Sequence, residues 1–332
     1  MVPQRTCVRD WVLSQQLGDC GRVGHITCLL LIALSLFLLL PFESPAGHRQ
    51  ELAAKKTLCY AFLRHGDIWT VCEGKREQIH IGRDLLDFAI SSDGTFLAYL
   101  IDTPELRRKG LFRYLDVVSL SPGFKTTEKQ VELRSLSATC GTILGLQVGI
   151  GKHPPTDVLL WKPLEFPPNL AFRCSSDRRV IAGLAEWNAS GRSELVVMIT
   201  EREQWRVPVY LLSPEDFDVS STGKYIAYFK AQEDQVYLCV AEPAGPVSCS
   251  LAAPGGANQV FVSDSGAVLY TTDLNQDCGG GPCSGVAYWR PGSAKPEIIE
   301  KNDSYSPQWI TPQVAATLHR WNSRRAAGHC RE

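Results

Sequence analysis

Cysteine is the residue type whose number and spacing give this sequence the most scope for chemistry. The chain of 332 residues contains 12 cysteines, seven histidines and two methionines. Paired cysteines bind zinc, exchange electrons or form structural disulfides, and the cellular compartment decides between these uses. Zinc is disfavoured because no second short Cys/His pair accompanies Cys278 and Cys283 at ligand spacing. We therefore expect disulfides, no metal site and no cofactor.

Opposed positions in predicted hairpins bring several cysteines within bonding range. If His65 and Gly66 form a two-residue turn, counting outward places Cys59 opposite Cys72. Directly opposed residues lie about 4.5 to 5.5 Å apart at Cα, which a disulfide can span. The disulfide candidates are Cys59–Cys72, Cys239–Cys249 around Ala244, the short loop Cys278–Cys283 and, less directly, Cys140–Cys174 near the same turn of neighbouring repeats. The alternative is that these cysteines are reduced, buried small hydrophobes.

An uncharged run from Ile26 to Phe42 directs the chain to a membrane. Its length is at the low end for a membrane-spanning helix and long for the apolar core of a cleavable signal. The preceding segment, 1–25, favours a retained anchor, whereas Ser44 and Ala46 offer small residues at the spacing of a signal-peptidase site. With either alternative the remainder of the chain, after a linker over 43–56, is expected outside the cytoplasm.

Familiar motifs for catalysis and for nucleic-acid binding are missing from the sequence. It contains no Gly-x-Ser-x-Gly, no His-Glu-x-x-His and no phosphate-binding glycine loop. His153, in "GKHPPTD", is expected to be a solvated loop histidine rather than a general base. The formal charge of −1, from 34 basic and 35 acidic residues, argues against a nucleic-acid partner.

A local pattern recurs along most of the chain. "FAISSDGTFLAY", at 88–99, returns in altered form at 135–146, 171–182, 217–228 and 260–271. Each copy places a turn between two apolar runs, which is typical of a β-hairpin. Aligned on the turn, the copies are 47, 37, 45 and 43 residues apart, and Trp309 follows after another 43. A period near 43 with four short strands in each unit predicts a propeller blade.

The segments "DIWTVCEGKREQIHIG" and "FAISSDGTFLAYL" resemble the repeats of TolB-like, WD-repeat-like propellers and of the propeller domains of prolyl-oligopeptidase-type peptidases. In these repeats a strand ending in Asp-Ile-Trp or Asp-Ile-Tyr precedes a Ser-Pro-Asp-Gly turn. Here serine replaces the proline at Ser92, and the turn is otherwise kept only at 91–94. The resemblance implies the propeller without the peptidases' catalytic domain, because only about twenty residues follow the last predicted strand.

The two ends of the repeat region complete each other. Residues 57–81 supply three strands without a preceding first strand, and "YSPQWI" is a first strand with nothing regular after it. A C-terminal strand that joins the N-terminal blade closes a ring without exposed edge strands. We therefore predict an all-β fold, a six-bladed β-propeller of four-stranded blades over 57–311, with a C-terminal tail over 312–332.

Polar residues recur where one blade's last strand passes to the next blade's first strand. These connections gather at one end of a propeller's channel, where a few oriented polar groups give a pocket its specificity. The candidate binding residues are Arg83, Asp84, Arg134, Glu215, Asp216, Asn258, Gln259, Asn302 and Asp303. The alternative is that they are polar because surface loops generally are.

By analogy with TolB-like domains, we expect a non-catalytic binding or scaffold domain for a protein, peptide or glycan, held at the membrane by its N-terminal helix or secreted. The rival class is a propeller hydrolase or lyase with an active site at the channel mouth.

Overall fold

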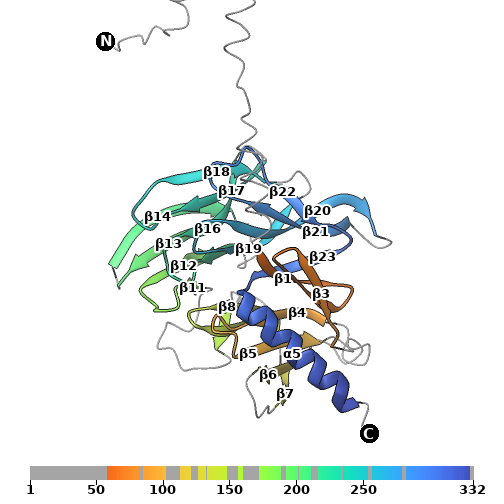
Figure 1. Ribbon diagram of the computed structural model, residues 1–332. Coiled ribbons are helices and arrows are strands. Elements are labelled where there is room, and N and C mark those ends of the chain that lie inside the picture. The colour runs from red at the N-terminus through yellow and green to blue at the C-terminus, as the bar shows by residue number, and fades with distance from the viewer. Residues whose placement is uncertain are drawn as a thin grey trace, which may run out of the picture. The chain divides into compact units, whose positions relative to one another are not determined.

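The computed structural model describes residues 58–81, 85–101, 113–120, 126–131, 133–147, 156–159, 172–187, 192–200, 202–210, 216–232, 235–252, 256–278 and 282–329. These residues belong to the second of two units, 56–332, into which the chain divides. Apart from one C-terminal helix, their regular structure consists of antiparallel sheets, so the predicted all-β class is confirmed (Figure 1).

The described strands form six sheets, which we number in chain order. The strands of each sheet are named in their order across the sheet, and the one named first is called its first strand. Sheet 1 contains β23 (Ser304–Trp309), β1 (Cys59–Arg64), β2 (Asp67–Cys72) and β3 (Lys75–Ile79). Sheet 2 contains β4 (Leu85–Ile90), β5 (Phe96–Ile101), β6 (Arg113–Ser119) and β7 (Thr126–Val131). Sheet 3 contains β8 (Leu133–Thr139), β9 (Thr142–Gln147) and β10 (Thr156–Leu159) among the described residues.

The remaining three sheets each contain four consecutive strands. Sheet 4 contains β11 (Phe172–Cys174), β12 (Val180–Trp187), β13 (Arg192–Ile199) and β14 (Arg202–Tyr210). Sheet 5 contains β15 (Phe217–Val219), β16 (Ile226–Gln232), β17 (Gln235–Ala241) and β18 (Val247–Leu251). Sheet 6 contains β19 (Ala257–Val262), β20 (Val268–Asp277), β21 (Pro282–Trp289) and β22 (Glu297–Glu300).

The strand registers confirm the cysteine pairing expected from the sequence. Arg64 pairs with Asp67 across the two-residue turn, and Cys59 lies opposite Cys72. All four candidate pairs are disulfides, namely Cys59–Cys72, Cys140–Cys174, Cys239–Cys249 and Cys278–Cys283.

The Ser-Asp-Gly turn reverses the chain between the first two strands of a sheet. In sheet 2, Ser91 Oγ accepts the Phe96 N–H at 2.9 Å and donates to Asp93 Oδ1 at 2.6 Å. Gly94 follows with φ +67°, and an added Cβ there would lie 2.6 Å from Val314 Cγ2. At Gly94, both the left-handed backbone and the close packing favour glycine, whereas the corresponding turn of sheet 4 has Arg178 with φ +62°.

Alternating strand directions give each sheet two distinct ends. We call the end with the turn between the first and second strands the turn end. The last strand of one sheet passes to the first strand of the next at the opposite end, which we call the connection end.

The first strands of neighbouring sheets are linked to one another by side chains. Gln308 in β23 accepts the Ile90 N–H of β4 at 2.9 Å and donates to the Ile90 carbonyl oxygen at 2.6 Å. Asp87 in β4 accepts the Leu136 N–H of β8 at 2.6 Å. In chain order the linked pairs are Gln308–Ile90, Asp87–Leu136, Thr139–Cys174, Arg173–Phe217, Asp218–Val262 and Gln259–Ser306. The links form a cycle that starts and ends at β23.

The junction between sheets 6 and 1 has an additional ionic link. Arg76 donates to both carboxylate oxygens of Glu300, at 2.5 and 2.6 Å, and the Tyr60 hydroxyl donates to the same carboxylate at 2.8 Å. Glu300 is buried, and burial together with this carboxylate raises the pKa of Tyr60. Because β23 and β1 pair beside this link, the chain's last strand completes its first sheet, as predicted.

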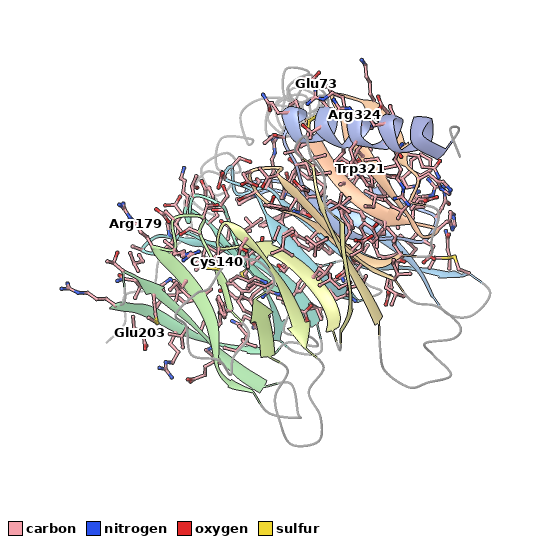
Figure 2. All side chains as sticks on the ribbon, turned by 90° about the horizontal axis from the view of Figure 1, so that it is seen from below. Glu73, Cys140, Arg179, Glu203, Trp321 and Arg324 are labelled. Carbon is pink, nitrogen blue, oxygen red and sulfur yellow. A yellow bond between two sulfur atoms is a disulfide. The ribbon has the colours of Figure 1, made fainter. Side chains whose placement is uncertain are left out.

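The C-terminal segment, interpreted from the sequence as a tail without regular structure, instead forms the helix α5 (Pro312–His329). Thr311 Oγ1 accepts the Val314 N–H at 3.2 Å, as an N-cap does, and Pro312 occupies the first helical position. The helix packs against β2 and β3, the orange strands of sheet 1 (Figure 2). Its buried face joins the core between sheets 1 and 2 through Val314, Leu318 and Trp321.

The predicted membrane segment, 26–42, lies outside the described residues. Within the described ranges, no helix has the length and apolar character needed to cross a membrane.

Removal of residues 304–332 should make the protein aggregate, because β1 loses its ladder partner and Ile90 loses the Gln308 side chain. Light scattering and size-exclusion chromatography would measure the effect. A chain ending at Arg325 is the matched control, since it retains β23 and the buried face of α5. A 1–303 chain that stays monomeric with unchanged melting would contradict the role of β23.

Candidate binding site

The described candidates lie at the connection end of three consecutive sheets. Asp216 precedes β15, Asn258 and Gln259 lie in β19, and Asn302 and Asp303 precede β23. The remaining four cannot be placed in the same way. Arg83, Asp84 and Glu215 lie outside the described residues, and Arg134 belongs to β8 with its side chain outside the described part.

A hydrogen-bond network joins sheets 5, 6 and 1 at this end. The Gln259 N–H donates to Asp216 Oδ1 at 3.3 Å, and Gln259 Nε2 donates to Ser306 Oγ at 3.2 Å. Gln259 Oε1 accepts the Thr271 hydroxyl at 2.9 Å and the Ser306 N–H at 3.2 Å. Asp216 is only 1% exposed. It therefore positions Gln259 from beneath rather than presenting its own carboxylate at the surface.

Bulges displace the first strands close to the connection end. The pairing of β19 with β20 shifts between Asn258 and Val260, and Gln259 has φ +52°. In β23, whose pairing with β1 also shifts, Ser306 has φ +49°. The pairings of β4 and β8 with their second strands shift near the same end. A bulge reorients a side chain away from the regular ladder, and bulges are frequent beside functional sites.

Exposed and half-buried amide and carboxylate groups lie close to the members of this network along the sequence. Asn258 and Asn302 are exposed, and Asp303 is half-buried with its Oδ1 3.5 Å from the Ser284 N–H that it accepts. Asn302 and Asp303 have φ +65° and +56°, a conformation that Asn and Asp tolerate better than most residues. This end of the fold thus presents hydrogen-bonding side chains on a tightly specified backbone.

Sequence reasoning did not identify Ser306 or Thr271 as members of the network. Ser306 precedes Pro307, and proline inside a strand is confined largely to edges and bulges. That proline was the available signal for the bulge. Nothing comparable marks Thr271, which lies between the apolar start of β20 and its polar remainder.

Two further charged residues lie in the first strands, where the sequence pattern is apolar. Asp218 accepts the Val262 N–H at 2.9 Å, and burial raises the pKa of its carboxyl to about 7 despite this bond and the nearby Arg173. Arg173 is 3% exposed and lies over the Phe217 ring at 5.7 Å. Because protein groups enclose both side chains, we assign them to the sheet junctions. The described residues contain no cluster of three or more His, Cys, Asp or Glu side chains suited to a metal ion.

These sheets and their linked first strands define a β-propeller. Among solved structures, the chain is similar to TolB from Acinetobacter baumannii, with 12% identity and a TM-score of 0.52 over 76% of this chain and 67% of that one. A nidogen/laminin complex is similar with 12% identity and a TM-score of 0.48, over 75% of this chain and 97% of that one. Pyrococcus horikoshii acylaminoacyl peptidase is similar with 12% identity and a TM-score of 0.39, over 71% of this chain and 41% of that one. No family model and no curated protein matches the chain. The resemblance to TolB expected from the sequence is confirmed at the level of fold.

Asp218 should make stability depend on pH. An unfolded aspartate has a pKa of about 4, so between about pH 4 and pH 7 the folded chain holds a proton that the unfolded chain releases. The protonated carboxyl's contribution is complete below this window and is lost as the pH rises to about 7. Relative to the wild type, Asp218→Asn should therefore gain stability between pH 5 and pH 8, by at most about 3 kcal/mol, because only the part of the window from pH 5 to pH 7 is crossed.

Denaturant unfolding of both proteins at the two pH values tests this expectation. The matched control is Asp264→Asn, because hydrogen bonds from Thr222 and Ser221 lower the pKa of that carboxyl although burial opposes them. Its contribution develops as the pH rises to the ordinary aspartate pKa and is complete by pH 5, so the difference between wild type and Asp264→Asn should not change between pH 5 and pH 8. A difference between wild type and Asp218→Asn that does not change with pH would contradict the assignment.

Proposed function

We propose that the chain is a six-bladed propeller that acts outside the cytoplasm as a non-catalytic domain and binds a protein partner at the connection end. The six described sheets and the cycle of links between their first strands support the blade count. The single observation that carries the binding proposal is the network of Asp216, Gln259 and Ser306, which fixes one end across three sheets.

A protein segment suits the chemistry of this end. Amide side chains such as Asn258 and Asn302 both donate and accept hydrogen bonds, as a peptide backbone does. Their exposed position leaves these groups available to a partner. Because the bulged strands and left-handed residues are already fixed, binding would require little ordering of this surface, which favours affinity.

The four disulfides support a location outside the cytoplasm, since such bonds persist in oxidising compartments. Attachment to a membrane through residues 26–42 is part of the proposal and rests on the sequence of that segment. The alternatives are a glycan partner and hydrolase or lyase chemistry in the channel. The experiment below distinguishes both from a protein partner.

Photo-crosslinking from the connection end tests the proposal. A photoreactive amino acid at Asn258 or Asn302 in the full chain, expressed in its native host, should capture a protein that mass spectrometry identifies. Ser265 and Glu73, exposed residues at the turn end, are the matched control positions. Asn302→Ala should then weaken capture from position 258, and Asn258→Ala should weaken capture from position 302, while both leave melting unchanged.

Equal capture from both ends, or capture from the turn end alone, would contradict the site. Elution of a glycan without protein would contradict the partner class. Turnover of a model ester or glycoside by the full chain would favour the enzyme alternative.

A further inference from the structure

Cys140–Cys174 differs from the other three disulfides in what it joins. Cys59–Cys72 and Cys239–Cys249 bridge neighbouring strands of one sheet, and Cys278–Cys283 closes the loop between β20 and β21. Cys140 follows β8 of sheet 3, whereas Cys174 ends β11 of sheet 4. Among the described pairs, this bond alone crosses from one sheet to the next. It also spans 34 residues of sequence, compared with 13, 10 and 5 for the others.

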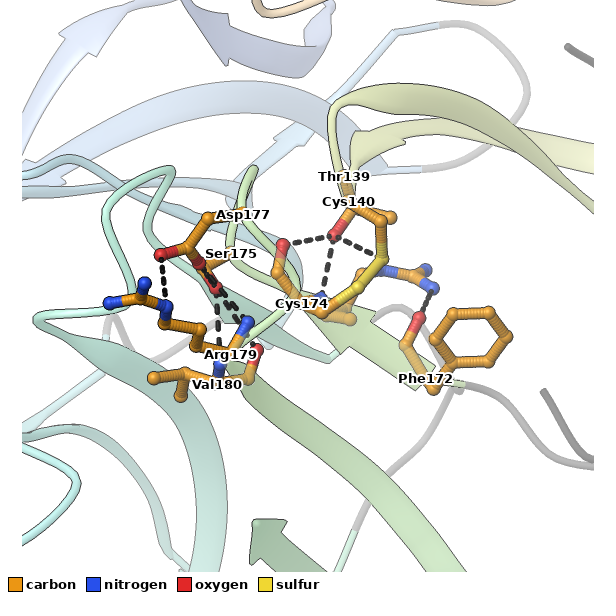
Figure 3. The surroundings of a disulfide bond; sticks show 9 residues. Thr139, Cys140, Phe172, Cys174, Ser175, Asp177, Arg179 and Val180 are labelled. Atoms are coloured by element: carbon orange, nitrogen blue, oxygen red, sulfur yellow. Dashed lines mark hydrogen bonds and ion pairs between the residues drawn. A yellow bond between two sulfur atoms is a disulfide. The ribbon is translucent and has the colours of Figure 1, made fainter. Parts of the chain in front are cut away.

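The turn that carries Cys140 lacks the side chains that stabilise the corresponding turns. In sheet 4 the Ser175 hydroxyl donates to Asp177 Oδ1 at 2.6 Å and its oxygen accepts the Val180 N–H at 3.1 Å (Figure 3). Sheet 3 has Thr139-Cys140-Gly141 at this point, without the serine and aspartate. The disulfide thus occurs where the local side-chain network of the other turns is missing.

Direct hydrogen bonds at this junction depend on the same two segments. The Cys174 N–H donates to Thr139 Oγ1 at 2.9 Å, and the Thr139 hydroxyl lies 3.1 Å from the Cys174 carbonyl oxygen. The Cys140 N–H donates to that carbonyl oxygen at 2.9 Å. All three bonds need Thr139 and Cys140 to stay against Cys174. A bond between the two sulfur atoms imposes that proximity covalently.

Burial also separates this disulfide from the others. Cys140 and Cys174 are each 1% exposed. Each of the other three pairs has one partner that is half-buried or exposed, namely Cys72, Cys249 and Cys278. A thiolate must reach a sulfur atom to reduce a disulfide. Cys140–Cys174 can therefore be attacked only after sheets 3 and 4 separate locally.

We propose that Cys140–Cys174 is a covalent latch between sheets 3 and 4. While oxidised, it holds the first strands of the two sheets together and so keeps the cycle of links closed. Opening requires two electrons and two protons from a dithiol reductant, which leaves thiols at Cys140 and Cys174 and converts the reductant to its own disulfide. Once reduced, the junction retains three hydrogen bonds and opens more often.

Hydrogen exchange in the double variant Cys140→Ser/Cys174→Ser tests the latch. Peptides covering β8–β9 and those covering β11–β12 should both exchange faster, by on the order of tenfold or more, because both sides of the junction open together. The matched control, Cys59→Ser/Cys72→Ser, removes a disulfide within sheet 1 and should accelerate exchange in β1–β2 alone. Faster exchange on only one side of the junction, or no change, would overturn the proposal.

Stepwise reduction of the wild-type protein gives a readout that does not require the variant to fold. Increasing dithiothreitol, followed by differential alkylation and peptide mapping, should reduce the three pairs with an accessible partner before Cys140–Cys174. Reduction of that last pair should coincide with faster exchange in sheets 3 and 4. Reduction of Cys140–Cys174 together with Cys278–Cys283, without a change in exchange, would show that the bond is not a latch.

Discussion

Hydrogen bonds from side chains to the backbone of the neighbouring first strand are the interactions on which the rest of this fold depends. A first strand has a ladder partner on one side only, and a buried backbone N–H left without a partner costs about 1–3 kcal/mol. Gln308, Asp87 and Asp218 supply partners to Ile90, Leu136 and Val262 in three different sheets. The same bonds fix how neighbouring sheets meet. The side chains that give buried backbone N–H groups their partners therefore also hold the sheets together.

This requirement also explains why the candidate site and the scaffold cannot be separated. Gln259 bonds to Asp216 in one neighbouring sheet and to Ser306 in the other, and it lies at a bulge near the connection end. A residue whose backbone N–H bonds to one neighbouring sheet and whose side chain bonds to the other has little freedom to adapt to a ligand. Recognition therefore falls to the exposed neighbours Asn258 and Asn302, while the residues beneath them keep their geometry constant.

Local patterns in the sequence were sufficient for the hairpins, the disulfides and the joining of β23 to β1. Counting outward from a two-residue turn placed Cys59 opposite Cys72 because register within a hairpin depends on that turn alone. Helix α5 was missed although Thr311-Pro312 is a recognisable helix start, since the helix contains no acidic residue to mark its first turn or to pair with its arginines. The links made by Arg173 and Asp218 could not be predicted, because they depend on which residues of the next sheet face them. For the same reason the sequence could identify polar connections but not distinguish buried Asp216 from exposed Asn302.

The pairing of β23 with β1 has a consequence for the time course of synthesis. Tyr60 and its partner Trp309 are separated by about 250 residues, which a ribosome adds in about 10 to 50 s at 5–20 residues per second. Throughout that interval the first strand to emerge has an open edge, and the later sheets are completed before it. Among the described strands, the oldest therefore pairs with β2 early but waits longest for its second ladder partner. Any factor that escorts the growing chain must keep the edge of Cys59–Arg64 covered until the final strand arrives.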